Sequence, residues 1–139
     1  MAVGHFCWWV RIDFARVQSA QCGGVADLST MPPPTLLVAD DHPLFRAAVL
    51  HVLRERFAQF HTLEAASAAT VSSTLQEHPE VELVLLDLTM PGARGFSTLL
   101  HVRGEYPEIP VVIISSNDHP RVIRRAQQFG AAGFIPKSA

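Results

Sequence analysis

The chain has 139 residues, of which 48% are hydrophobic and 17% charged, and its formal net charge is −2. These values are typical of one globular domain with a single core. They argue against nucleic-acid binding by this segment, because there is no excess of basic residues to contact phosphates. No apolar run approaches the roughly 20 residues needed to span a bilayer, so we expect no membrane partner and a cytoplasmic location.

The first part of the chain differs in composition from everything after it. Residues 1–34 end in the proline run Pro32–Pro34 and are interpreted as an N-terminal extension of unknown role. Met31, directly before the prolines, is an alternative start of the biological chain. A docking segment around Phe6–Phe14, where apolar residues cluster with Arg11 and Arg16, is the functional alternative. The predicted domain therefore covers residues 35–139.

Within that domain, short apolar runs alternate with helical patterns. The apolar runs are of strand length and bounded by turn signals. Five strands are predicted, at Leu36–Ala39, Phe60–Glu64, Glu82–Asp87, Ile109–Ile114 and Gly133–Pro136.

Four helices are predicted between these strands, each with an apolar stripe on one side. The first begins near Pro43 and is expected to bury Phe45, Ala48, Val49 and Val52, with Arg46, His51 and Arg54 facing water. The second carries Ala68, Val71 and Leu75 and stops at His78–Pro79. The third is expected to bury Phe96, Leu99 and Leu100. The fourth, from about His119 to Phe129, is expected to bury Val122, Ile123, Ala126 and Phe129, with Gly130 as its C-cap.

Regular alternation of strands and helices predicts a doubly wound α/β fold. Its five-stranded sheet would be parallel, with helices on both faces and right-handed crossovers. In the flavodoxin-like strand order 2-1-3-4-5, the first and third strands are neighbours, and ligands bind at the carboxyl ends of the strands. Asp40 and Asp41 follow the first strand, Asp87 ends the third and Lys137 follows the fifth. We therefore expect these four side chains to meet at one rim.

Three converging carboxylates repel one another, so either their pKa values rise or a cation binds between them. Mg²⁺ takes oxygen ligands and commonly uses one or two carboxylates together with phosphate oxygens. Asp41 and Asp87 are predicted to bind it directly and Asp40 through water. The backbone carbonyl of Thr89 is a further candidate ligand.

Asp87 is also a candidate nucleophile, because a carboxylate that attacks phosphorus forms an aspartyl phosphate. Lys137 would offset the charge of the transferred group, and the Ser115 hydroxyl, at the end of the fourth strand, would donate to a phosphoryl oxygen. Taken singly, an Asp after a strand is more often a helix N-cap or turn residue, and a lone Lys is usually solvated. Their combination at four strand ends favours a phosphoryl-accepting site.

Four runs resemble the receiver domain of bacterial two-component response regulators. They are V-A-D-D-H-P-L-F-R, L-V-L-L-D-L-T-M-P-G, P-V-V-I-I-S-S and G-A-A-G-F-I-P-K. The first resembles the class with a LuxR/NarL-type DNA-binding output. The resemblance covers about Thr35 to Ala139 and implies a CheY-like fold. It also implies a role for each site residue: Asp87 as phosphoacceptor, Asp40 and Asp41 as the acidic pair for Mg²⁺, Ser115 as the switch hydroxyl, Phe134 as the aromatic switch and Lys137 as the invariant-type lysine. Thr89 and Asn117 fall where the family varies its residues.

The function implied by the resemblance is phosphorylation-controlled signalling. A sensor histidine kinase or phosphotransfer domain would supply the phosphoryl group, and the downstream output would be transcriptional, through a DNA-binding domain outside this segment. The protein would not be a turnover enzyme. An aspartate-nucleophile phosphatase is a weaker reading, because that class needs a second Asp where Thr89 stands. A pseudo-receiver that serves protein interaction alone is the remaining alternative.

The chain departs from the family after Lys137. Receiver domains continue with a fifth helix that packs on the same face of the sheet as the first, whereas this chain ends at Ala139. We interpret it as a fragment of a longer regulator, incomplete at the C-terminus. Apolar surface on the first, third and fifth strands is then expected to be uncovered, which favours partner binding or a homodimer. Phe134 has a plainer alternative as a core aromatic.

Overall fold

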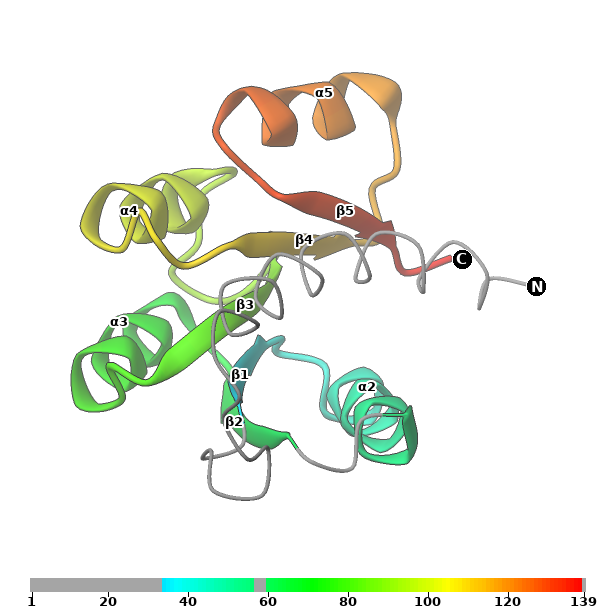
Figure 1. The fold of residues 1–139 in the computed structure, drawn as a ribbon. Helices are drawn as coiled ribbons and strands as arrows, with labels where there is room; N and C mark the ends of the chain where they lie inside the picture. Colours follow the sequence, from blue (N-terminus) through cyan, green and yellow to red (C-terminus); the bar gives the residue numbers. More distant parts are fainter. Residues whose placement is uncertain (1–33, 57–59, 139) are drawn as a thin grey trace, which may run out of the picture.

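The computed structural model describes residues 34–56 and 60–138, and the predicted extension therefore lies almost wholly outside the described residues. Within these ranges, five strands alternate with four helices (Figure 1). In chain order they are β1 (Thr35–Ala39), α2 (Pro43–Arg56), β2 (His61–Ala65), α3 (Ala68–Glu77), β3 (Val81–Asp87), α4 (Ser97–Glu105), β4 (Val111–Ser115), α5 (Pro120–Gln128) and β5 (Gly133–Pro136).

The strands form one parallel sheet in the order β2-β1-β3-β4-β5, which confirms the predicted fold class. The predicted strand positions are confirmed to within two residues. β4 begins at Val111 rather than at Ile109, because Pro110 has no N–H to donate to a neighbouring strand. Because all the strands are parallel, their carboxyl ends lie along one edge, where the predicted polar residues stand.

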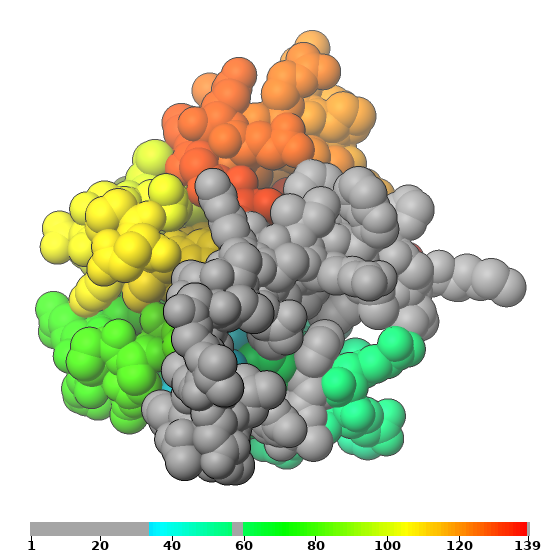
Figure 2. Space-filling model, in the orientation of Figure 1, coloured from blue at the N-terminus to red at the C-terminus, as the bar shows by residue number. Residues whose placement is uncertain are grey.

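Helices cover the two faces of the sheet unequally. Successive strand residues point to opposite faces, so Leu37 and Leu36 belong to different clusters. The Leu37 face packs against α3, α4 and α5, which contribute Val71, Leu99 and Ala126. In the space-filling view, the outer sides of these three helices form one flank of the molecule (Figure 2). None of the helices in the described ranges is long and apolar enough to cross a bilayer.

On the opposite face, α2 packs against the sheet, and the expectation that apolar side chains would be exposed there is wrong for β1 and β3. Leu36 and Val38 of β1 and Leu85 of β3 are buried in a cluster with two leucines of α2, Leu50 and Leu53. On β5, Ile135 is half-buried at the edge of the same cluster.

The buried side of α2 differs from the predicted stripe. Leu50 and Leu53 are buried and Phe45 and Val49 partly so, whereas Ala48 is exposed and Val52 is 42% exposed. Apolar residues surround most of this helix, so their spacing does not define a single face. Leu100 of α4 is likewise 48% exposed, because the helix turns by about 100° between Leu99 and Leu100 and only Leu99 faces the sheet.

The predicted C-cap of α5 is wrong by one residue, because the C-cap is Phe129 and Gly130 is the residue after it. Gly130 has φ +94° and donates its N–H to the carbonyl of Gln127 at 3.1 Å. A side chain is disfavoured at such a φ, and a Cβ here would lie 3.0 Å from Nε of Arg103. Only glycine fits this position without strain.

We expect Gly130→Ala to lower the free energy of unfolding by about 1–2 kcal/mol, the cost of placing a residue with a Cβ in the left-handed region. Gly104→Ala is the matched control, because Gly104 lies in α4 with nothing within 4 Å of the added Cβ. It should stabilise the protein by up to about 1 kcal/mol. Urea unfolding of the two variants would measure both values, and equal effects would contradict the assigned backbone conformation.

Candidate functional site

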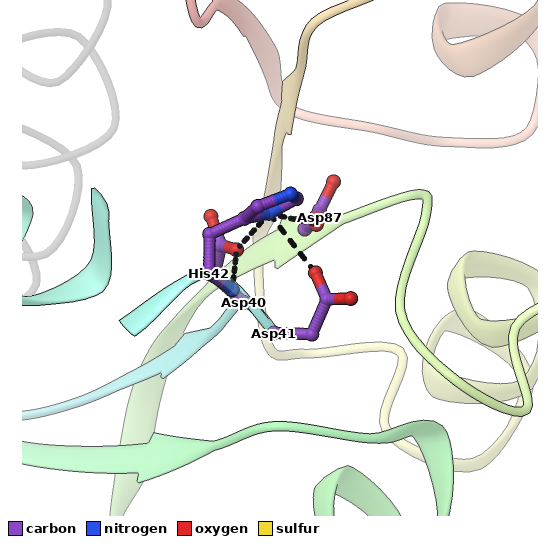
Figure 3. Close-up of side chains that lie close together, drawn as sticks. All are labelled: Asp40, Asp41, His42 and Asp87. Atoms are coloured by element: carbon purple, nitrogen blue, oxygen red, sulfur yellow. Dashed lines mark hydrogen bonds and ion pairs between the residues drawn. The ribbon is translucent and has the colours of Figure 1, made fainter. Parts of the chain in front are cut away.

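Three aspartates meet at the carboxyl edge of the sheet, as expected. Asp40 and Asp41 follow β1 directly, and Asp87 is the last residue of the neighbouring strand β3. Together with His42 they offer ligand atoms that all lie within 4.8 Å of one another (Figure 3). Asp40 is 1% exposed and Asp87 0%. Two carboxylates are therefore largely removed from water at the same place.

Lys137 brings a positive charge to this cluster from the end of β5. Its Nζ lies 3.0 Å from Oδ2 of Asp40 and 3.4 Å from Oδ2 of Asp87. The same atom stands 4.8 Å from the centre of the Phe45 ring, which lies on the first turn of α2. An ammonium over an aromatic face is attracted to it, so Phe45 helps to hold the cation in the site.

Asp87 has a restricted environment. Both the N–H and the hydroxyl of Thr89 donate to its carboxylate, at 3.2 and 3.1 Å. Loss of solvation raises the pKa of Asp87, and the charge of Asp40 adds to that rise. The backbone hydrogen bond from Thr89 and the charge of Lys137 act in the opposite direction and do not cancel it. Asp87 is therefore a poorly solvated, electron-rich carboxylate.

The remaining predicted residues lie around this centre. Ser115 is buried at the end of β4, one position beyond the register partner of Asp87, and its Oγ accepts a hydrogen bond from the N–H of Asn117 at 3.1 Å. Within the described residues it is not hydrogen-bonded to Asp87. Phe134 is half-buried against the core on the α3–α5 face. The side chain of Thr89 contacts Asp87, whereas the role of its backbone carbonyl stays a prediction.

Two residues of the site were missed by the sequence analysis. His42 extends its ring into the acidic cluster, with Nδ1 at 3.0 Å from Asp41 Oδ1. Arg46, predicted to face water, instead donates to the backbone carbonyl of Asp40 and pairs with Glu64 at 2.9 Å. It lies one turn into α2, facing back over the end of β1, and so anchors the acidic loop. The adjacency of His42 to the two aspartates was the available signal.

The residues present fit a divalent cation. Oδ2 of Asp40 and Oδ1 of Asp41 are buried and accept no well-aligned hydrogen bond among the described residues; the nitrogen atoms that face them are Lys137 Nζ and His42 Nδ1, each at 3.0 Å. Buried carboxylate oxygens are costly unless paired, and hard cations such as Mg²⁺ take such oxygens as ligands. Lys137 supplies one positive charge against three aspartates. The donor set therefore suits Mg²⁺ at Asp40, Asp41 and Asp87.

Comparison with known proteins gives a consistent result. A family model described as the response regulator receiver domain matches residues 36–139. The chain is 42% identical over 104 residues to a glycerol metabolism activator of Pseudomonas putida, covering 75% of this chain and 47% of the relative. It is 31% identical over 110 residues to the nitrate/nitrite response regulator NarL of Escherichia coli, covering 79% of this chain and 50% of the relative. It thus spans about half the length of these curated relatives.

A solved structure shares the fold. The signal receiver domain of NarL from Mycobacterium tuberculosis superposes with a TM-score of 0.69 and 33% sequence identity, covering 78% of this chain and 87% of that chain. The strand order and the arrangement of the helices therefore belong to a known receiver fold.

The raised pKa of Asp87 predicts a pH-dependent stability difference in the absence of divalent ions. Ionised Asp87 is less favourable in the folded than in the unfolded state, so its penalty is absent below the ordinary pKa of Asp and grows as pH rises through the raised value. At neutral pH, Asp87→Asn should therefore melt at a higher temperature than the wild type. Thermal unfolding with chelator between pH 3 and 8 would show the gain disappearing at low pH, and a gain independent of pH would contradict this origin.

Proposed function

The chain belongs to the response regulator receiver domain family, and we propose on that premise that Asp87 accepts a phosphoryl group from a phosphohistidine. The donor would be a sensor histidine kinase or a phosphotransfer domain. The observation that supports this most is the buried Asp87 carboxylate, which lies within 3.4 Å of Lys137 and beside Asp40 and Asp41.

In the proposed transfer, an oxygen of Asp87 forms a bond to phosphorus while the bond between phosphorus and the donor imidazole nitrogen breaks. The electron pair of the broken bond stays on that nitrogen. Thr89 orients the carboxylate through its two donors, and the Lys137 ammonium offsets the negative charge of the incoming group. Preorganised charges of this kind lower the barrier without reorganising during the reaction.

Asp40, Asp41 and Asp87, with the backbone carbonyl of Thr89, would hold Mg²⁺. When bound, this ion would neutralise part of the charge on the transferred phosphoryl group. Asp40 and Asp41 have the further task of keeping the ion beside the acceptor, and Arg46 fixes the loop that carries them through its bond to the Asp40 carbonyl.

Ser115 and Phe134 would convert phosphorylation into a change of shape. Among residues 34–56 and 60–138, the Ser115 hydroxyl only accepts from the N–H of Asn117, and it can donate to a phosphoryl oxygen once one is present. Its movement would give space to Phe134, which is half-buried on the adjacent strand β5. Two packings would then be biased by a local change of charge.

Receiver domains are signalling modules, and we propose no metabolic turnover for this one. The output would be control of transcription, since the glycerol metabolism activator and the NarL protein among its relatives carry names of regulators. We propose that the protein acts in the cytoplasm. DNA would be contacted through an output domain and not through residues 35–139. A second copy of the domain is a further candidate partner.

Incubation with acetyl phosphate and Mg²⁺ should add one phosphoryl group to the wild-type protein, as measured by intact-protein mass. Asp87→Asn should show none, because the amide is not a nucleophile, while keeping its circular dichroism spectrum. Label retained in Asp87→Asn would assign the acceptor elsewhere. A folded wild type that takes no label would favour an interaction-only module, and continuous release of phosphate from small organic phosphates would favour a phosphatase.

The proposed switch predicts different behaviour for two neighbouring serines. With fluorinated phenylalanine, phosphorylation should shift the ¹⁹F resonance of Phe134, assigned by Phe134→Leu. Ser115→Ala should still accept the phosphoryl group but lose this shift, because the donating hydroxyl is missing. Ser116→Ala, at the exposed next position, should behave as the wild type. A full shift in Ser115→Ala would show that Phe134 responds without the Ser115 hydroxyl and would contradict the proposed switch.

A further inference from the structure

His42 places a ring nitrogen in the middle of the acidic cluster. Its Nδ1 lies 3.0 Å from Oδ1 of Asp40, 3.0 Å from Oδ1 of Asp41 and 3.9 Å from Oδ2 of Asp87 (Figure 3). The N–H of His42 also donates to Oδ1 of Asp40 at 2.7 Å, which fixes the backbone at the start of the loop. The ring therefore approaches the carboxylates from a short, well-anchored segment.

Neither placement of the ring hydrogen satisfies all the neighbours of Nδ1. Nζ of Lys137 lies 3.1 Å from this nitrogen and carries donors only. With a hydrogen on Nδ1, the ring can donate to Asp40 or Asp41 but faces the ammonium donor to donor. Without it, the ring accepts from Lys137 but turns a lone pair toward two carboxylate oxygens. A divalent cation would take the lone pair of Nδ1 and that of Asp41 Oδ1, while the Lys137 ammonium keeps its ion pairs with Asp40 and Asp87.

The spacing of the atoms agrees with a metal-binding set. Ligands about 2.1 Å from a metal in octahedral geometry are separated by about 3.0 Å when adjacent and about 4.2 Å when opposite. The distances from Nδ1 to Asp40 and Asp41 equal the adjacent separation, and the 3.9 Å to Asp87 approaches the opposite one. In addition, the buried Oδ1 of Asp41 has, in the described part of the chain, no hydrogen-bond donor other than the one that Nδ1 could supply.

We propose that His42 is a nitrogen ligand in this site, and that the site prefers a divalent transition ion over Mg²⁺. Imidazole nitrogen suits ions such as Ni²⁺, Co²⁺ and Zn²⁺, whereas Mg²⁺ takes oxygen. Asp40, Asp41 and Asp87 serve either class of ion, and His42 adds affinity for the transition ions alone. This deepens the proposed function, because it uses the same acidic cluster, but it concerns which ion occupies the cluster.

Isothermal titration calorimetry of the purified chain, with no phosphoryl donor, tests the proposal. Removal of the ligand in His42→Ala should weaken Ni²⁺ binding about 10- to 100-fold, the range seen when groups supporting a metal are removed. Mg²⁺ binding should change less than about 2-fold, since its ligands are carboxylates. The His42 side chain is 60% exposed, so the variant should fold normally. With Co²⁺, the visible absorption band should also shift on loss of the nitrogen ligand.

His51→Ala is the matched control, which tests whether loss of another exposed histidine also weakens Ni²⁺ binding. His51 lies on α2, the helix that begins directly after His42. It is exposed and pairs with Glu55. Its removal should leave Ni²⁺ and Mg²⁺ binding unchanged. An equal loss of Ni²⁺ affinity in His51→Ala, or an equal loss of both ions in His42→Ala, would overturn the proposal. So would tighter Ni²⁺ binding in His42→Ala, because the ring would then exclude the ion.

Failure of this proposal can be told from failure of the proposed function. If the wild type is phosphorylated with Mg²⁺ but His42→Ala keeps the wild-type preference for Ni²⁺, only the role of His42 is overturned. If His42→Ala loses that preference while the wild type takes no phosphoryl group, the metal assignment stands and the phosphoacceptor function does not.

Discussion

The burial of negative charge at one edge of the sheet governs this structure. Asp40 and Asp87 are almost fully removed from water, and their side chains approach the same ammonium. An isolated buried carboxylate would be far too costly to keep ionised, so the arrangement depends on Lys137 and on the donors of Thr89. Burial outweighs these partners and, with the charge of Asp40, raises the pKa of Asp87. A site that is incompletely neutralised favours binding of a cation beside the poorly solvated carboxylate of Asp87.

The parallel sheet produces this concentration of charge at little cost elsewhere. Its interior strands are almost entirely apolar and are buried on both faces, so the polar residues of these strands stand at or near their ends. The order β2-β1-β3-β4-β5 then brings together residues that are about fifty positions apart in the chain. Rigid strands fix the backbone of Asp87, while Asp40, Asp41 and Lys137 lie on the segments just beyond their strands. The site thus combines one residue within a strand with several that backbone and side-chain hydrogen bonds hold just beyond their strands.

Sequence patterns were sufficient for the sheet and for the meeting of Asp40, Asp41, Asp87 and Lys137, because strand ends and strand order define where they lie. They were insufficient for α2, whose apolar residues surround the helix, so the buried positions Leu50 and Leu53 were set by packing and not by spacing. They also missed the ring of His42 and the reach of Arg46 to the Asp40 carbonyl. Such contacts depend on the rotamers of long side chains, which periodicity does not encode.

One backbone contact links the two ends of the site. The N–H of Lys137 donates to the carbonyl of Ser115 at 2.8 Å, so the residue with the ammonium and the residue with the hydroxyl are joined across the last rung of β4 and β5. A displacement of the Ser115 backbone would therefore also displace Lys137, and the ammonium would move relative to the aspartates. The placement of the hydroxyl and the placement of the ammonium over the aspartates are thus coupled through one main-chain contact.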